Sequence, residues 1–190
     1  MEEAAPLEWI FGYGSVIWRP SFPFVERRVA VLGGWSRRFW QSSEDHRGVP
    51  GAPGRVVTLV PIAGARCVGV AFRVARDELE RVVRELDGRE VGGYTRRCVE
   101  VRLDDDREVQ ALSWIAVEGN PWFAGDAPTD VIAAQIASAH GPSGSNREYL
   151  MKLAEALGEL AASRGDDAHV YALAEAIHGQ EVASSTPAGD

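Results

Sequence analysis

The sequence has little cysteine and no long apolar run. Cys67 and Cys98 are the only cysteines among 190 residues, too few for a disulfide framework and typical of a reducing cytoplasm. No stretch approaches the roughly 18 consecutive apolar residues that a membrane helix needs. The segment 1–6 is acidic, which is unlike a secretory signal or a transit peptide. We therefore expect a cytoplasmic protein with no membrane partner.

Histidine is scarce, and the chain has no excess of positive charge. The four histidines show neither the helical spacing of a zinc-binding pair nor a Cys-x-x-Cys partner, so no metal site is expected. A formal net charge of −8 argues against a nucleic-acid partner, because binding to phosphates needs a broad positive surface. Both cysteines lie in strand-like segments, where we expect buried thiols. None of these features indicates an oligomeric state.

The order of predicted elements favours an α+β fold. The first half carries β-branched and aromatic segments bounded by glycine and proline, which is typical of strands, and the last third is helical. The predicted strands are 9–13, 28–32, 36–41, 55–60, 67–74, 98–103 and 109–117, and the predicted helices are 77–88, 129–140, 145–163 and 167–178. Strands and helices do not alternate as a doubly wound sheet requires. We therefore expect a small mixed or antiparallel β-barrel with flanking helices.

Two helix starts carry the capping-box pattern, in which an N-cap side chain is followed three residues later by a glutamate. Asp77 with Glu80 is one, and Ser145 with Glu148 is the other. We expect helices to begin at both places.

The limits of the domain follow from composition. A single catalytic domain is expected over residues 9–178, without internal repeats. The segments 1–8 and 180–190 are expected to be flexible tails. Within the domain, residues 43–54 combine glycine, proline and charged residues, which predicts a loop.

A glycine-punctuated turn follows the first predicted strand. The segment Gly12-Tyr13-Gly14-Ser15 could bring backbone N–H groups close to an anion, since glycine has no Cβ in the way. A dinucleotide-binding loop would need a third glycine and a helix directly behind it, and the sequence shows neither. The pattern Gly-x-Ser-x-Gly is absent too, which disfavours a nucleophilic Ser15. A small carboxylate or amide ligand is at least as well supported as a phosphate.

Several carboxylates stand at the end of the predicted central helix. Glu85, Asp87 and Glu90 precede the pair Gly92-Gly93. The simplest interpretation is a solvated helix end, where these carboxylates pair with neighbouring arginines. The partial negative charge of a helix C-terminus nevertheless raises the pKa of a nearby carboxyl group, which suits a general base near neutral pH. Glu90, beyond the helix and beside the glycines, is the carboxylate best placed to face inward.

Three further features allow both a structural and a functional interpretation. Residues 45–48 combine Asp, His and Arg, although an Asp–Arg pair that anchors the loop is a sufficient explanation. The turn at 141–145 leads into a helix whose first N–H groups could bind an anion, although capping alone accounts for its composition. Tyr149 lies in the first turn of that helix and belongs either to the core or to a cleft.

Taken together, these segments resemble the ChaC-like γ-glutamylcyclotransferase family, of the glutathione-specific type. The resemblance covers about residues 9–175, nearly the whole chain. Six segments carry it in the same order as in the family: 11–18, 36–41, 45–48 with 53–59, 86–94, 120–121, and 141–150. One departure is Val16, where the family usually has leucine, and this change is conservative.

The resemblance implies a fold, an activity and a set of site residues. The fold is a small β-barrel with flanking helices. The activity is cleavage of reduced glutathione to 5-oxoproline and cysteinylglycine, without a cofactor. The family's catalytic glutamate falls on Glu90, and Tyr149 is expected to hydrogen-bond the glutamyl group. The family's substrate-binding turn falls on Ile10, Phe11, Gly12, Tyr13, Gly14 and Ser15.

Two alternatives remain open at this point. The same cyclisation could act on another γ-glutamyl peptide or on a γ-glutamyl amine. A protein could also keep the pocket and bind a γ-glutamyl ligand without catalysis. In each case the expected partner is a small molecule.

Overall fold

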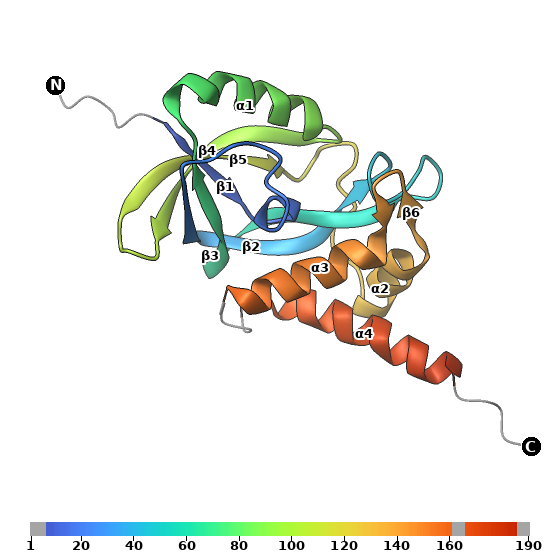
Figure 1. Cartoon of the computed structure of the whole chain (residues 1–190). Helices are drawn as coiled ribbons and strands as arrows, with labels where there is room; N and C mark the ends of the chain where they lie inside the picture. Colours follow the sequence, from blue (N-terminus) through green and yellow to red (C-terminus); the bar gives the residue numbers. More distant parts are fainter. Residues whose placement is uncertain (1–6, 161–165, 186–190) are drawn as a thin grey trace, which may run out of the picture.

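Five strands close into a barrel in the order β1-β3-β2-β4-β5 (Figure 1). The computed structural model describes residues 7–160 and 166–185. The strands are β1 (Trp9–Gly12), β2 (Glu26–Ser43), β3 (Gly54–Arg73), β4 (Tyr94–Leu103) and β5 (Glu108–Ala116). Neighbours pair antiparallel except β1 and β5, which pair parallel. The predicted mixed β-barrel with flanking helices is therefore confirmed.

The two longest strands differ from the prediction. The segments 28–32 and 36–41 are halves of β2, and 55–60 and 67–74 are halves of β3. Glycines near the middle of each strand resembled chain breaks in the sequence. In the structure the register between β2 and β3 shifts at Gly33/Trp35, where Gly34 has a φ of 79°. This irregularity leaves Gly34 of β2 opposite residues 62–65 of β3, and the ladder continues on both sides of it.

The helices lie on two sides of the barrel. Figure 1 shows α1 (Arg76–Arg89) alone above it, while α2 (Thr129–Ser138), α3 (Asn146–Glu159) and α4 (Ala168–Ser185) pack together on the other side. A single 3₁₀ turn, η1 (Ser15–Ile17), follows β1, and the short strands β6 (His140–Gly141) and β7 (Gly144–Ser145) precede α3. No helix in the described part of the chain combines the length and the apolar character needed to span a bilayer.

One of the two predicted helix starts carries its side-chain N-cap. Ser145 is the N-cap of α3, and its side chain accepts a hydrogen bond from the Glu148 N–H at 3.1 Å. The prediction at Asp77 is wrong, because α1 begins at Arg76 and its N-cap, Ala75, makes no side-chain cap. Asp77 instead lies in the first turn, where a negative charge complements the helix dipole.

The chain ends differ in part from the expected tails. Helix α4 continues to Ser185, past the end predicted at residue 178, so the expected tail of 180–190 is helical over its first residues. At the other end, the carbonyl of Glu8 accepts a hydrogen bond from the Val74 N–H at 2.9 Å. The remaining tail residues, 1–6 and 186–190, lie outside the described residues.

The two cysteines differ in burial. Cys67 is buried, as predicted, whereas Cys98 is exposed on the outer surface of β4. Successive side chains of a strand point to opposite faces. Because Val99 and Val101 point into the core, Cys98 points outward, where its thiol donates to Gln110 Oε1 at 3.2 Å. The prediction of a buried thiol at Cys98 is therefore wrong.

A fully buried arginine ties the barrel to the helical layer. The side chain of Arg37 in β2 is 0% exposed, and its Nη1 pairs with Asp167 Oδ1, directly before α4. Its Nη2 donates to the Val68 carbonyl at 2.5 Å, and its Nε donates to the Tyr13 carbonyl at 2.7 Å. Arg37 thus joins the start of α4 to the glycine turn after β1.

Candidate active site

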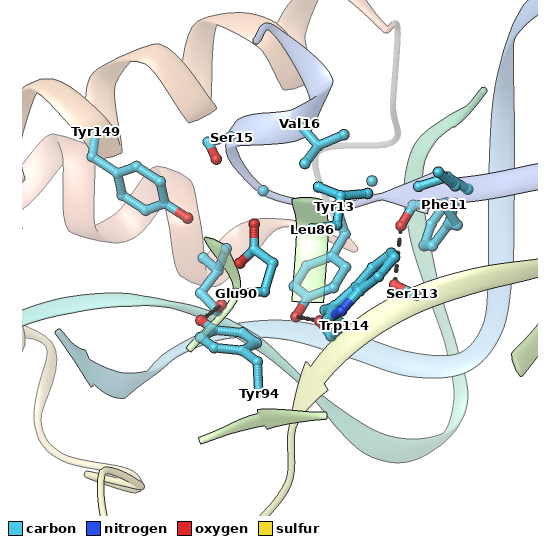
Figure 2. Close-up of a pocket in the computed structure, with 14 residues that line it drawn as sticks. Phe11, Tyr13, Ser15, Val16, Leu86, Glu90, Tyr94, Ser113, Trp114 and Tyr149 are labelled. Atoms are coloured by element: carbon cyan, nitrogen blue, oxygen red, sulfur yellow. Dashed lines mark hydrogen bonds between the residues drawn. The ribbon is translucent and has the colours of Figure 1, made fainter. Parts of the chain in front are cut away.

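A pocket of about 60 Å³, here called the inner pocket, lies at the end of β1 (Figure 2). Every residue that the family resemblance placed in a site lines it. The complete lining is Ile10, Phe11, Gly12, Tyr13, Gly14, Ser15, Val16, Val57, Leu86, Glu90, Tyr94, Ser113, Trp114 and Tyr149. The predicted site residues are thus brought together in one place.

The glycines of the turn are needed for close packing. A Cβ at Gly12 would lie 2.7 Å from Val16 Cγ1, and one at Gly14 would lie 3.1 Å from the Tyr149 hydroxyl. Gly14 has a φ of −122°, so left-handed backbone is not the reason for glycine there. The chain then enters η1, although no helix was expected after the turn, and the first N–H groups of a helix have no partner within it. A polar ligand in the inner pocket could meet these groups.

Glu90 is the C-cap residue of α1, and its own N–H donates to the Leu86 carbonyl at 2.8 Å. Its side chain is 23% exposed, and Figure 2 shows its carboxylate pointing into the inner pocket among Tyr13, Tyr94 and Tyr149. Burial raises the pKa of the Glu90 carboxyl, and this effect outweighs the lowering by nearby cations. The pKa shift has the predicted direction, but burial is its chief cause.

The other carboxylates at the end of α1 follow the simpler interpretation. Glu85 and Asp87 form ion pairs with exposed arginines at 2.6 and 3.0 Å. Asp87 also accepts a hydrogen bond from the Trp114 indole at 2.9 Å, which fixes one wall of the inner pocket. Among the carboxylates of the described residues, Glu90 alone lines that pocket.

Three tyrosines surround the Glu90 carboxylate. The Tyr13 hydroxyl donates to the Trp114 carbonyl, and the Tyr94 hydroxyl donates to the Val57 carbonyl, each at 2.6 Å. Burial raises the pKa of Tyr13, Tyr94 and Tyr149 above the ordinary tyrosine value. These phenols therefore stay protonated and leave Glu90 as the proton acceptor of the inner pocket.

A larger cavity of about 450 Å³, here called the outer cavity, adjoins the inner pocket. Four residues line both: Ser15, Glu90, Tyr94 and Tyr149. Glu90 therefore stands where the two spaces meet.

Arg89 connects the glycine turn to the carboxylate. Its Nη2 donates to Ser15 Oγ at 2.7 Å, its Nη1 donates to Ser21 Oγ at 2.9 Å, and its Nε lies 3.4 Å from Glu90 Oε1. A guanidinium group cannot accept a proton, so this partner does not activate Ser15 as a nucleophile. The geometry agrees with the sequence, which disfavours a nucleophilic serine.

The loop at 45–48 is not anchored by the expected Asp–Arg pair. Asp45 accepts a hydrogen bond from Ser43 at 3.0 Å and lies 3.8 Å from the His46 ring. Arg47 reaches across to Glu148 in α3 at 3.4 Å. Within residues 7–160 and 166–185, no three His, Cys, Asp or Glu side chains gather as metal ligands.

Sequence reasoning missed several residues around the site. Trp114 and Tyr94 form part of the inner pocket, while Arg89 and Arg47 line the outer cavity. Tyr94, Arg89 and Arg47 fall within segments that carry the family resemblance, which was a usable signal. Trp114 had no signal beyond that of a strand residue.

Comparisons with known proteins place this chain in a family. The family described as ChaC-like protein matches residues 8–180. A human protein named glutathione-specific gamma-glutamylcyclotransferase 1 is 40% identical over 173 residues, which cover 89% of this chain and 78% of that protein. A Saccharomyces cerevisiae protein named glutathione-specific gamma-glutamylcyclotransferase is 33% identical, with 90% of this chain and 95% of that protein covered. A crystal structure of the glutathione-specific yeast cyclotransferase matches with a TM-score of 0.83 at 31% identity, covering 90% of this chain and 95% of that one. This chain therefore belongs to the ChaC-like family.

Proposed function

We propose that this protein is a γ-glutamylcyclotransferase that converts reduced glutathione to 5-oxoproline and cysteinylglycine. The curated relatives named for this activity support the proposal. The observation that carries it is Glu90, the carboxylate that lines the inner pocket beside the glycine turn. We assign the catalytic role to Glu90 and substrate binding to the turn 10–15 and Tyr149.

The first step is removal of a proton from the substrate's α-ammonium group. Ordinary α-amines titrate near ~8, so a carboxylate with a raised pKa can accept this proton at modest cost. Glu90 meets that need, because burial raises its pKa.

The second step is ring closure. The free α-amine attacks the γ-carbonyl carbon of the same glutamyl group, and the new C–N bond closes a five-membered ring. Because nucleophile and carbonyl belong to one molecule, the protein mainly has to hold the reactive conformer. Backbone N–H groups of the turn 12–15, with the Tyr149 hydroxyl, stabilise the developing oxyanion, typically by roughly 3 kcal/mol per donor.

The third step is collapse of the tetrahedral intermediate. The bond from the former carbonyl carbon to the cysteinyl nitrogen breaks, and the carbonyl re-forms as the lactam of 5-oxoproline. Two protons leave the attacking nitrogen during the reaction, and the departing nitrogen gains two. Glu90 carries them in turn, so the enzyme returns to its starting state and the charges balance.

The proposal is tested by incubating the purified protein with reduced glutathione and with a panel of other γ-glutamyl peptides and amines. Mass spectrometry should detect 5-oxoproline and cysteinylglycine in equal amounts from glutathione. Turnover of another donor with none of glutathione would contradict the assigned substrate. Binding of glutathione by calorimetry without any product would indicate the non-catalytic alternative.

The acid side of the pH profile should depend on Arg89. This guanidinium group lowers the pKa of Glu90, and the carboxylate must be ionised to accept a proton. In Arg89→Gln the pKa of Glu90 rises, so the acid limb of kcat/KM should move to higher pH. Arg89→Lys keeps the charge and should keep the limb close to its original position. A limb that stays in place or moves to lower pH in Arg89→Gln would contradict this.

Both cysteines should be dispensable for catalysis. Neither Cys67 nor Cys98 lines the inner pocket or the outer cavity, and burial raises the pKa of the Cys67 thiol to about 11. Cys98→Ala and Cys67→Ala should release 5-oxoproline at near-normal rates. Loss of turnover in either folded variant would point to a thiol nucleophile instead.

We also propose a cytoplasmic location. Both cysteines are free, and free thiols are typical of reducing compartments. Subcellular fractionation of the source cells, with an antibody against this chain, checks the location directly.

A further inference from the structure

The outer cavity gathers positive charge that the chain as a whole does not have. The chain carries a formal net charge of −8. Four cationic side chains nevertheless line this cavity, against three carboxylates. The cationic residues are Arg19, Arg47, Arg89 and Lys152. The lining therefore has a formal excess of one positive charge, which favours an anionic ligand.

Arg47 is the most enclosed of these cations, and unlike Arg89 it does not bond to the glycine turn. Its side chain is 10% exposed and stacks over the Tyr149 ring, with 5.4 Å from Cζ to the ring centre. Its side-chain hydrogen bonds within the described chain all use Nη1, to the Ser145 carbonyl at 3.1 Å and to Glu148 at 3.4 Å. Nε and Nη2 make no side-chain hydrogen bond within the described chain, and neither atom is fully enclosed. Because Arg47 lines the outer cavity, this cavity is where the two donors can meet a ligand.

Lys152 adds a second positive charge beside Arg47. Lys152 lies one turn after Glu148 in α3, and its Nζ is 2.6 Å from Glu148 Oε1. Arg47 and Lys152 thus share a single carboxylate. Together, Arg47, Lys152 and Glu148 leave one uncompensated positive charge at the outer cavity.

The proposed reaction places the leaving group in this cavity. The inner pocket is small, and buried side chains such as Phe11 and Trp114 line it, so it has room for the glutamyl group alone. Glu90 must reach both the attacking and the departing nitrogen, and it lines both spaces. The departing dipeptide therefore extends outward from Glu90. Two residues span at most ~7 Å when extended, and the far end of this dipeptide is a free carboxylate.

We propose that Arg47, assisted by Lys152, binds the C-terminal carboxylate of the leaving dipeptide and thereby selects γ-glutamyl peptides over γ-glutamyl amines. This inference rests on the proposed function and adds a specificity-determining residue to it. Nε and Nη2 of an arginine lie in the fork geometry that binds both oxygens of a carboxylate. Arg47 is held in place for this by its Nη1 bonds and by the Tyr149 ring.

The test compares two substrates that differ only in this charge, glutathione and its C-terminal carboxamide. Release of 5-oxoproline is measured as kcat/KM for the wild type, Arg47→Gln and Arg19→Gln. We expect the wild type to prefer the carboxylate about 10- to 100-fold, as for a hydrogen-bonded ion pair. Arg47→Gln should lose that preference. Arg19→Gln, which removes an exposed cation from the same cavity, should retain it.

The comparison separates recognition from a structural effect, because Arg47 also bonds the start of α3. A structural effect lowers kcat/KM equally for both substrates and leaves the preference intact, which would overturn the inference. Arg47→Lys is the second variant in case Arg47→Gln does not fold, and it should keep only a few-fold preference. Equal turnover of both substrates by the wild type overturns the inference alone. Turnover of neither substrate contradicts the proposed function itself.

Discussion

Replacing Glu90 with glutamine is expected to lower kcat for 5-oxoproline release by about 10²- to 10⁴-fold, the usual contribution of a general base. The amide has nearly the shape of the carboxylate but cannot take the ammonium proton. The fold should survive, because the Glu90 side chain forms one ion pair within the described residues, a 3.4 Å contact with Arg89. Substrate binding should change little by comparison, since the turn and Tyr149 are untouched.

Glu85→Gln is the matched control for this variant. Glu85 stands on the same helix but is exposed and pairs with Arg81 outside both cavities. It should leave kcat within about twofold, as expected for a surface substitution. A Glu90→Gln protein that is folded, binds glutathione and turns it over at a near-normal rate would rule out the proton-transfer role.

Replacing Asp167 with asparagine is expected to lower the free energy of unfolding by about 3–5 kcal/mol. The change leaves the guanidinium group of Arg37 fully buried without its counter-charge. The midpoint of urea denaturation should fall while the slope of the transition stays the same. The site should be affected too, since Arg37 Nε donates to the Tyr13 carbonyl in the glycine turn.

Two comparisons test this explanation. Asp166→Asn removes a partly exposed pair with Arg66 at 2.9 Å and should cost no more than about 1 kcal/mol. The double variant Arg37→Met with Asp167→Leu removes both charges, so it should recover much of the loss seen in Asp167→Asn. Equal losses in Asp167→Asn and Asp166→Asn would contradict a special role for the buried pair.

The inner pocket could be predicted largely from the sequence because its chemistry lies in short segments. The glycine turn and Glu90 each carry a local signal, and the order of the segments carries the family resemblance. The fold class followed from the pattern of strands and helices. The lengths of β2 and β3 could not be predicted, since a glycine at an irregularity inside a strand resembles one that ends a strand.

The surroundings of the site depend on contacts that no local pattern shows. Arg89 meets Ser15 across 74 positions of the chain, and Arg47 meets Glu148 across 101. Only closure of the barrel and packing of α3 bring such pairs together. The prediction that Cys98 is buried failed for a related reason. The sequence of a strand shows which residues share a face, but it does not show which face packs against the core.

The central claim is that the substrate's own amine, and not water, attacks the γ-carbonyl group while Glu90 moves the protons. The most direct measurement is mass spectrometry of the products formed from glutathione in water enriched in the heavy isotope of oxygen. Intramolecular attack predicts 5-oxoproline without the heavy isotope, together with an equal amount of cysteinylglycine. Glutamate that carries the heavy isotope in its γ-carboxylate would show hydrolysis and would contradict the account.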